Sequence, residues 1–268
     1  RKRFIPTLKG VFLSFNPFHQ LTLKLEKNLF ESGRCKKLIA ISQMVKNDIL
    51  KHYNCPQENI SVVYNGVNLS RFHPENKDLH RKNIRRELKI PENSVLILFV
   101  GSGFERKGLK ALLQAMQYLR SEDWRLLIMG KGKWKKYLQF APENLRSRII
   151  YKEPVSDIER YYSAADIFAL PSIYEPFGNA NLEALASGLP VITTRHCGAA
   201  DIIEHGQNGL IVESPESAKE LAENINILFD PSLRRSMGQN GRTLAEKFSV
   251  KTNTREMLKT YQEIITTQ

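Results

Sequence analysis

The sequence predicts an α/β protein built around a parallel sheet that helices cover on both faces. From residue 95 onward, short runs rich in Val, Ile and Leu alternate with helix-like segments. Parallel strands have this composition because both of their faces are buried, and the alternation is typical of repeated βα units. The chain of 268 residues also exceeds the ~100–200 residues of one domain. We therefore expect one large or two modest domains, with a Rossmann-like unit in the second half.

Composition narrows the class of protein. Hydrophobic residues make up 41% and charged residues 25%, which is ordinary for a globular protein, and no stretch approaches the ~20 apolar residues of a membrane helix. The three cysteines, at positions 35, 55 and 197, are odd in number and widely spaced. This spacing predicts neither a disulfide framework nor a zinc site, and it fits a reducing cytoplasm. The net charge of +12 favours anionic partners: nucleic acid, acidic membrane or phosphorylated substrates.

The first 37 residues combine positive charge with apolar side chains. They hold nine Lys and Arg against two Glu, interleaved with Phe, Leu, Ile and Val. One interpretation is an interfacial segment that lies on anionic lipid. The other is a surface loop and helix whose apolar residues pack on the rest of the domain. Because the chain opens on Arg1, we expect it to begin within a longer protein.

Two short strands precede a connector. Residues 37–42 predict a buried strand that ends in Ser42, which can cap a helix over 43–53. A second strand over 60–64 stops at an Asn-Gly turn. Residues 68–83 are polar and contain a proline, which indicates a loose connector between domains.

The second half supplies the βα units. The predicted strands cover 95–100, 126–129, 149–151, 167–170 and 191–194, and the predicted helices cover 109–119, 134–140, 158–164, 180–186, 218–228, 231–248 and 252–265. Rossmann-like sheets bind ligands outside the carboxyl ends of their strands. The candidate site should therefore lie on the loops that follow these strands.

The segment from Glu175 to Glu183 carries two carboxylates eight positions apart around Gly178. Glycine lets the backbone approach a ligand closely, and a helix that starts there directs free N–H groups at an anion. Carboxylates are good partners for hydroxyl groups, so the two acids could bind different parts of one ligand. The alternative is a loop glutamate and a helix glutamate that are both merely solvated.

Several ordered motifs resemble a known family. They are Leu170-Pro171-Ser172, the Glu175 to Glu183 segment, Ala186 to Ile192, and Cys197-Gly198. Together they are similar to the donor domain of the family 4 retaining glycosyltransferases, which have the GT-B fold. The connector from Tyr64 to Pro74 resembles the family's N-G-V-D-x3-F-x-P pattern, with Asn68 in place of the Asp. The resemblance covers residues 26–268.

The resemblance implies two Rossmann-like domains that face each other across a cleft. Residues 1–74 would be the remainder of an amino-terminal acceptor-side domain and its linker, residues 75–250 the donor domain, and residues 251–268 a helix that crosses back. The family's Gly-Gly loop and the first strands of its acceptor domain have no counterpart in the sequence. About 100 residues of a two-domain enzyme would then be absent. We expect such a chain to bind nucleotide but to transfer sugar poorly.

The family also implies roles for individual residues. Arg106 and Lys107 would hold the donor diphosphate, which suits a planar fork and a point cation, and with Glu175 on the donor-sugar hydroxyls they form the expected catalytic set. Glu183 would bind the ribose, and Val155 the base. The expected substrate-binding set is Ser102, Gly103, Val155, Phe177, Gly178, Asn179, Ala180, Asn181, Leu182 and Glu183, with the backbone N–H groups of residues 178–181 on phosphate. No metal and no cofactor are expected, because the nucleotide sugar is a substrate and cations with a helix dipole replace the metal.

Within the family, the basic amino-terminal segment and the loops at 102–108 and 197–198 look most similar to lipopolysaccharide core glucosyltransferases. The expected reaction moves a hexose, glucose by this resemblance, from a UDP-linked donor to a lipopolysaccharide-core or other glycan or glycolipid acceptor. The expected location is the cytoplasm, and the first interpretation of residues 1–37 would add attachment to the inner face of the cytoplasmic membrane. No specific nucleic acid is expected as a partner.

Two other classes of protein stay open at this point. A sugar-nucleotide epimerase or a phosphorylase uses a related scaffold, but the first lacks this ordered motif set and the second needs a pyridoxal-bearing lysine motif that the sequence does not show. A basic nucleic-acid-binding module would explain the charge, but it would leave the glutamate pair and the glycine loops without a purpose.

Overall fold

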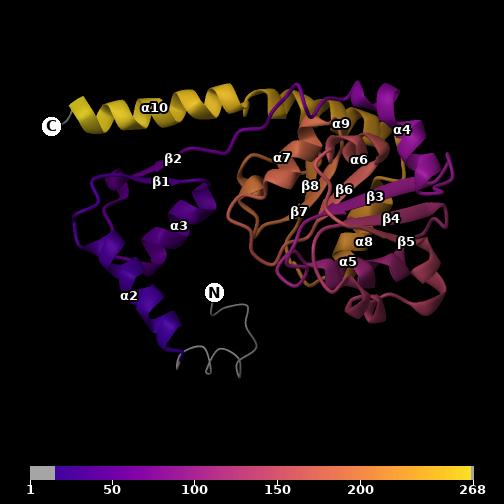
Figure 1. Cartoon of the computed structure of the whole chain (residues 1–268), viewed down its shortest axis with the longest axis horizontal. Helices are drawn as coiled ribbons and strands as arrows, with labels where there is room; N and C mark the ends of the chain where they lie inside the picture. Colours follow the sequence, from indigo (N-terminus) through magenta and orange to yellow (C-terminus); the bar gives the residue numbers. More distant parts are fainter. Residues whose placement is uncertain (1–15, 267–268) are drawn as a thin grey trace.

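The computed structural model describes residues 16–266 (Figure 1). Its larger part is a six-stranded sheet formed by β3 (Val95–Val100), β4 (Trp124–Met129), β5 (Ile149–Lys152), β6 (Ile167–Leu170), β7 (Val191–Thr194) and β8 (Gly209–Val212). The strands are all parallel in the order β5-β4-β3-β6-β7-β8, which is the order of a doubly wound sheet. The five predicted strands are confirmed. The sixth, β8, lies outside the predicted set because it is a four-residue run that begins with glycine.

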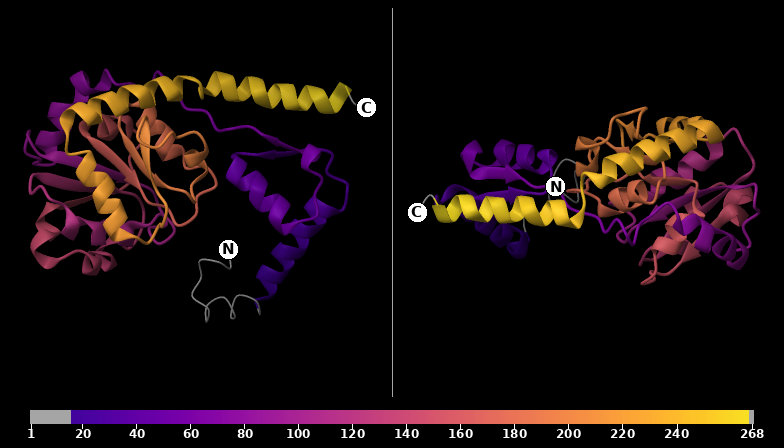
Figure 2. Two further views of the ribbon diagram at one scale, coloured as in Figure 1. Left: turned by 180° about the vertical axis from the view of Figure 1, so that it is seen from behind. Right: turned by 90° about the horizontal axis from the view of Figure 1, so that it is seen from above.

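Helices cover both faces of this sheet. On one face α5 (Leu109–Ala115) packs against α8 (Ala218–Ile227), and on the other α4 (Asn76–Glu87) packs against α6 (Glu159–Ala164) and α7 (Asn179–Ala186) against α9 (Pro231–Glu246) (Figures 1 and 2). The strands between them are almost fully buried. The helix expected over 134–140 is instead two 3-10 turns, Trp134–Lys136 and Leu138–Phe140. Gly132 and Pro142 bound this segment, and glycine and proline are the two least favourable residues in a helix.

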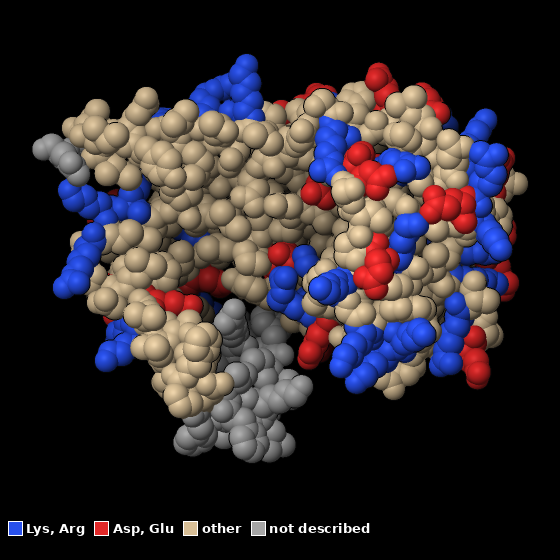
Figure 3. Space-filling view, in the orientation of Figure 1, with Lys and Arg blue, Asp and Glu red and all other residues tan. Residues whose placement is uncertain are grey.

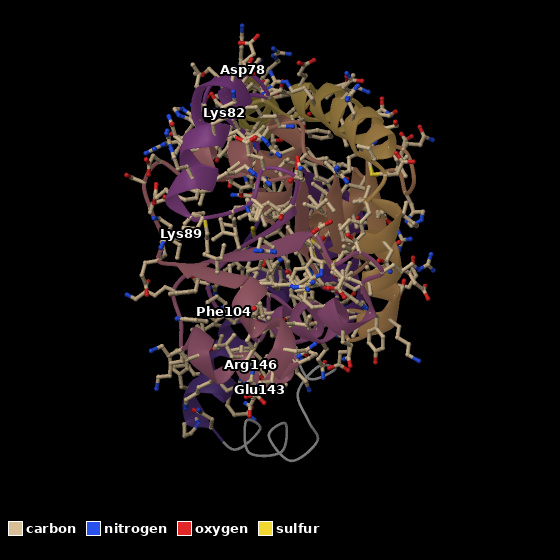
Figure 4. All side chains as sticks on the ribbon, turned by 90° about the vertical axis from the view of Figure 1, so that its right-hand side faces the viewer. Asp78, Lys82, Lys89, Phe104, Glu143 and Arg146 are labelled. Atoms are coloured by element: carbon tan, nitrogen blue, oxygen red, sulfur yellow. The ribbon has the colours of Figure 1, made fainter. Side chains whose placement is uncertain are left out.

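Helix α4 corrects the prediction of a loose connector over 68–83. Its buried face is built mainly from polar side chains, so no apolar period reveals it. Arg81 Nη1 donates to the carbonyls of Ala164 and Ala165 at 2.9 and 3.0 Å, and its Nη2 pairs with Asp166 at 2.8 Å. Arg85 is also buried, while Asp78 and Lys82 point away from the sheet (Figure 4).

The amino-terminal part is a smaller βα unit. Its elements are α2 (Pro17–Glu31), β1 (Leu38–Ala40), α3 (Gln43–His52) and β2 (Ile60–Val62). β1 and β2 are parallel, and a small cluster of Ala40, Cys55 and Ile60 fills the space beneath them. Ser42 caps α3 as predicted, because its hydroxyl accepts a hydrogen bond from the amide of Val45 at 3.1 Å.

Helix α10 (Val250–Thr266) extends from the larger part across the amino-terminal part (Figures 1 and 2). The backbone of Val67 pairs with this junction on both sides, to Phe248 at 2.9 Å and to Val250 at 3.1 Å. Asn253 Nδ2 donates to the carbonyl of Tyr64 at 2.7 Å. Within residues 16–266, no helix is both long enough and apolar enough to span a bilayer.

Candidate active site

A cavity of about 400 Å³ lies where the strand order reverses, at the carboxyl ends of β3 and β6. Ligands of doubly wound sheets bind at this kind of reversal. The lining comes from both parts of the chain: Ile41, Asn65, Val100, Gly101, Ser102, Lys107, Glu175, Pro176, Phe177, Gly178, Asn179, Ala180 and Glu183. Acidic and basic atoms meet near the junction of the two parts (Figure 3).

The three residues expected to be catalytic lie together. Glu175 Oε2 contacts Arg106 Nη1 and Lys107 Nζ, each at 2.5 Å. Lys107 and Glu175 are mostly buried, with side chains 12% and 13% exposed, while Arg106 is 49% exposed and also donates to the carbonyl of Tyr174 at 3.0 Å. Lys107 and Glu175 line the cavity, whereas Arg106 contacts Glu175 but is not among the lining residues, and 69 positions separate Arg106 from Glu175 in the sequence.

The loop after β3 depends on its glycines. Gly108 has a φ of +75°, and a Cβ added to it would lie 1.8 Å from the carbonyl oxygen of Pro171. Only glycine therefore lets this loop pack directly on the loop after β6. Gly103 has a φ of +77° and faces open space, and the hydroxyl of Ser102 accepts the amide of Lys131 at 3.0 Å. Ser102 thus joins the cavity rim to the turn after β4.

Helix α7 begins at Gly178, whose φ of +84° is left-handed. Asn179 and Ala180, at the first turn, line the cavity. The expectation that the backbone amide of Asn181 binds phosphate needs correction, because this amide donates to the carbonyl of Gly178 at 2.9 Å. Among the four amides expected to bind phosphate, those of Gly178, Asn179 and Ala180 remain candidates.

Three side chains of the expected binding set face the core. Phe177, Asn181 and Leu182 are 1%, 0% and 1% exposed. Phe177 is nevertheless among the residues that line the cavity, whereas Asn181 and Leu182 are not. Asn181 Nδ2 lies 3.2 Å from Cys197 Sγ, which donates to the carbonyl of Phe177 at 3.1 Å. Burial raises the pKa of the Cys197 thiol to about 11, so it stays protonated.

Glu183 contacts Tyr162, which is not among the expected site residues. The hydroxyl of Tyr162, on α6, donates to Glu183 Oε2 at 2.7 Å. Burial raises the pKa of the Glu183 carboxyl, while this hydrogen bond and the charges of Arg71 and Lys107 act in the opposite direction. No spacing pattern could reveal the pair, because it joins two helices on neighbouring βα units.

Val155 lies apart from the other expected site residues. It is half-buried on the loop after β5 and packs against the core, and it is not among the residues that line the cavity. Arg71 holds this loop, since its guanidinium binds the carbonyl of Ser156 and pairs with Glu159 at 2.8 Å. The connector thus contacts the loop expected to bind the base.

The amino-terminal part is fastened to the loop that carries Glu175. Ser42 Oγ donates to the carbonyl of Pro176 at 2.7 Å, and the hydroxyl of Tyr174 donates to Asp48 at 2.9 Å. Asp201 accepts the amides at the start of α3 at 2.6 and 3.2 Å. Position and orientation of this loop therefore depend on both parts of the chain.

Known proteins are similar to this chain in sequence and in fold. The family model described as "Glycosyl transferases group 1" matches residues 80–244, and that described as "Glycosyltransferase Family 4" matches residues 1–71. An uncharacterized glycosyltransferase of Methanocaldococcus jannaschii is 30% identical over 84% of this chain and 60% of its own length. The lipopolysaccharide glucosyltransferase WaaG of Escherichia coli K12 is 30% identical over 89% of this chain and 65% of its own length.

The solved structures agree with this assignment. A crystal structure of WaaG, a glycosyltransferase involved in lipopolysaccharide biosynthesis, superposes with a TM-score of 0.80 and 27% identity over 90% of this chain and 67% of that one. The α/β class and the GT-B fold expected from the sequence are confirmed. The chain spans less than two thirds of the length of the two curated relatives named above. By the match to more than half of its residues, the chain belongs to the glycosyl transferases of group 1.

Proposed function

We propose that this chain binds a sugar nucleotide and takes part in retaining transfer of a hexose to a glycan or glycolipid. The observation that carries the proposal is the contact of Arg106 and Lys107 with Glu175 beside the first turn of α7. Cations and a helix amino terminus at one end of a cavity suit a diphosphate. The neighbouring carboxylate suits the hydroxyl groups of a sugar.

In the proposed reaction the protein mainly positions the donor and stabilises developing charge. Arg106 and Lys107 neutralise the departing nucleoside diphosphate, assisted by the amides of Asn179 and Ala180. Glu175 holds the hydroxyl groups of the donor sugar. The leaving phosphate takes the acceptor proton on the face from which it departs, so the proposal requires no separate base, metal or cofactor.

The name of one relative supports a choice of substrate. WaaG of E. coli is a lipopolysaccharide glucosyltransferase. We extend glucose, a UDP-linked donor and a lipopolysaccharide-core acceptor to this chain as part of the proposal. We also propose that the protein acts in the cytoplasm.

The exposed face of α2 supports a further part of the proposal, docking of residues 1–37 on an anionic membrane surface. Phe18, Leu21, Leu25 and Leu29 are 77%, 55%, 60% and 51% exposed, and they recur at helical spacing. Lys24 and Lys27 lie on the same helix. Residues 1–15, which carry four of the nine basic residues of this segment, lie outside the described part of the chain.

Calorimetry with UDP, GDP, ADP and their glucose conjugates tests the donor site. A ligand at ~100 times its dissociation constant raises the free energy of unfolding by about 2.7 kcal/mol, which thermal shifts detect. Lys107→Ala should weaken UDP binding by roughly tenfold or more, because a hydrogen bond to a charged group contributes about 1.5–3 kcal/mol. Uridine, which has no phosphate, should bind the variant and the parent protein equally.

Lys110→Ala is the matched control, since this exposed lysine follows on α5 and is not among the residues that line the cavity. It should leave the affinity for UDP unchanged. A parent protein that responds to none of the nucleotides, or a folded Lys107→Ala variant with full UDP affinity, would contradict the proposal.

A further inference from the structure

A buried phenol supports the carboxylate of Glu183 at the wall of the cavity. The Tyr162 hydroxyl lies 2.7 Å from Glu183 Oε2 and 3.4 Å from the carbonyl of Ala180. The shorter contact to a charged acceptor identifies Glu183 as the partner of the phenolic proton. Glu183 lines the cavity, whereas Tyr162 is 0% exposed and cannot touch a ligand.

We propose that Tyr162 is a positioning residue for ribose recognition: it fixes one oxygen of Glu183 so that the other is presented to the ribose hydroxyl groups. The inference rests on the proposed function. A carboxylate offers about four acceptor sites on two oxygens, and Tyr162 uses one of them. The remaining sites on Glu183 stay available toward the cavity.

The surroundings of Tyr162 leave its ring little freedom. Phe72 meets it edge-on, with ring centroids 5.5 Å apart at 88°, and Phe168 of β6 lies 5.7 Å away on the sheet side. A ring packed in this way holds its hydroxyl at a fixed place. Phe72 belongs to the connector between the two parts of the chain, so the connector and the sheet together hold the phenol.

The hydrogen bond from Tyr162 matters because the carboxylate of Glu183 is largely buried. Burial disfavours its charged form, and the donated hydrogen bond favours it. Without Tyr162, both the direction and the charge of the carboxylate would be less well defined. A hydrogen bond to ribose depends on both, because a charged acceptor in a fixed orientation binds more strongly.

Titration calorimetry of Tyr162→Phe with UDP and with 2′,3′-dideoxy-UDP tests the inference. The parent protein should bind UDP at least tenfold more tightly than the dideoxy analogue. The variant should lose roughly fivefold to tenfold in UDP affinity and nothing in affinity for the analogue, which has no ribose hydroxyls for Glu183 to bind. The ratio of the two affinities, and not their absolute values, carries the result.

Tyr161→Phe is the matched control. Tyr161 is the preceding residue of α6 and is also buried, but its ring lies under the ammonium group of Lys152 at 5.3 Å. This variant should keep the full preference for UDP. An equal loss of affinity for both ligands in Tyr162→Phe would show a merely structural role. Unchanged affinity for both ligands would likewise overturn the inference.

A second measurement distinguishes orientation from general loss of packing. In the Glu183→Ala background, Tyr162→Phe should have no further effect on UDP affinity, because the phenol then has no carboxylate to direct. In the single variant, loss of the hydrogen bond from Tyr162 should raise the pKa of Glu183. As the pH is lowered, UDP affinity should therefore begin to fall at a higher pH in the variant than in the parent protein. Failure of the parent protein to bind UDP would refute the proposed function itself, whereas normal binding with an additive double variant would refute only the role of Tyr162.

Discussion

At the scale of single residues, Glu183 shows a conflict between stability and function. Its position at the cavity wall suits a ligand, but burial raises the pKa of its carboxyl above the ordinary 4.5. The folded protein therefore binds this proton more tightly than the unfolded chain does. By linkage, stability is lost as the pH rises from the ordinary value through the raised one. At neutral pH the ionised carboxylate destabilises the fold.

Glu183→Gln should accordingly unfold at higher urea concentration than the parent protein at pH 7. The difference should shrink at pH 4, where the parent carboxyl is itself largely protonated. UDP affinity at pH 7 should fall by roughly tenfold, in line with about 1.5 kcal/mol for a hydrogen bond to a charged group. Glu223→Gln, at an exposed position of α8, should change neither property. A Glu183→Gln variant less stable than the parent at pH 7 would contradict the linkage.

At the scale of elements, the site exists because two loops and a helix start meet around glycines. A Cβ at Gly178 would lie 2.8 Å from Asn181 Nδ2 and 2.9 Å from Cys197 Sγ, both of which are buried. Its φ of +84° is unfavourable for any other residue. The amino terminus of α7 can approach an anion only because this turn stays as narrow as it is.

Gly178→Ala should destabilise the protein by about 1–3 kcal/mol for the strained backbone and by a further ~1–3 kcal/mol for overpacking. UDP affinity should fall more than uridine affinity, since in the proposed donor complex the turn faces the phosphates. Gly206→Ala is a matched control: its φ is also +84°, but no atom lies within 4 Å of the added Cβ. Urea unfolding of the two variants separates backbone strain from crowding, and equal losses in both would show that crowding at Gly178 has no effect.

The sequence predicts some helices and strands more clearly than others. The buried parallel strands are predictable because they are apolar on both faces, and Ser42 marks the start of α3 by its cap. Helix α4 is not predictable from periodicity, because Arg81 and Arg85 bury guanidinium groups against carbonyls and Asp166. The cation pair of the site follows from its glycine-flanked loop. Tyr162 does not, because only the tertiary fold brings its hydroxyl to Glu183.

At the scale of the whole molecule, the amino-terminal part is held to the loop that carries Glu175, while among residues 16–266 the apolar side chains of α2 are largely exposed. The contacts of Ser42 and Asp48 fix α3 against the loop of Glu175. α2 is the next helix outward and presents Phe18, Leu21 and Leu25 to the surface. A membrane bound there would lie on the same part of the chain that contacts the donor loop.

Co-sedimentation with vesicles tests this arrangement. The protein should bind phosphatidylglycerol vesicles better than phosphatidylcholine vesicles, and salt should weaken binding, because basic residues near an anionic surface contribute about 1 kcal/mol each and are screened. Replacement of Leu21 and Leu25 by Ser should reduce binding. Leu79→Ser, which alters a 66% exposed leucine on α4, should not. Equal and salt-independent binding to both kinds of vesicle would contradict membrane docking. The apolar residues of the segment 1–37 would then be explained by packing on the rest of the domain.

In the proposed function, the contact of Arg106 and Lys107 with Glu175 gives donor binding the character of an ion exchange. A diphosphate that binds the two cations competes with the carboxylate for them, because both cations contact Glu175 Oε2. An intact sugar nucleotide compensates this loss by offering Glu175 its hydroxyl groups. Once the sugar has been transferred, the nucleoside diphosphate offers no such replacement, and Glu175 competes again for the same cations. In the proposed reaction the carboxylate that helps to hold the donor thus also helps to expel the spent product.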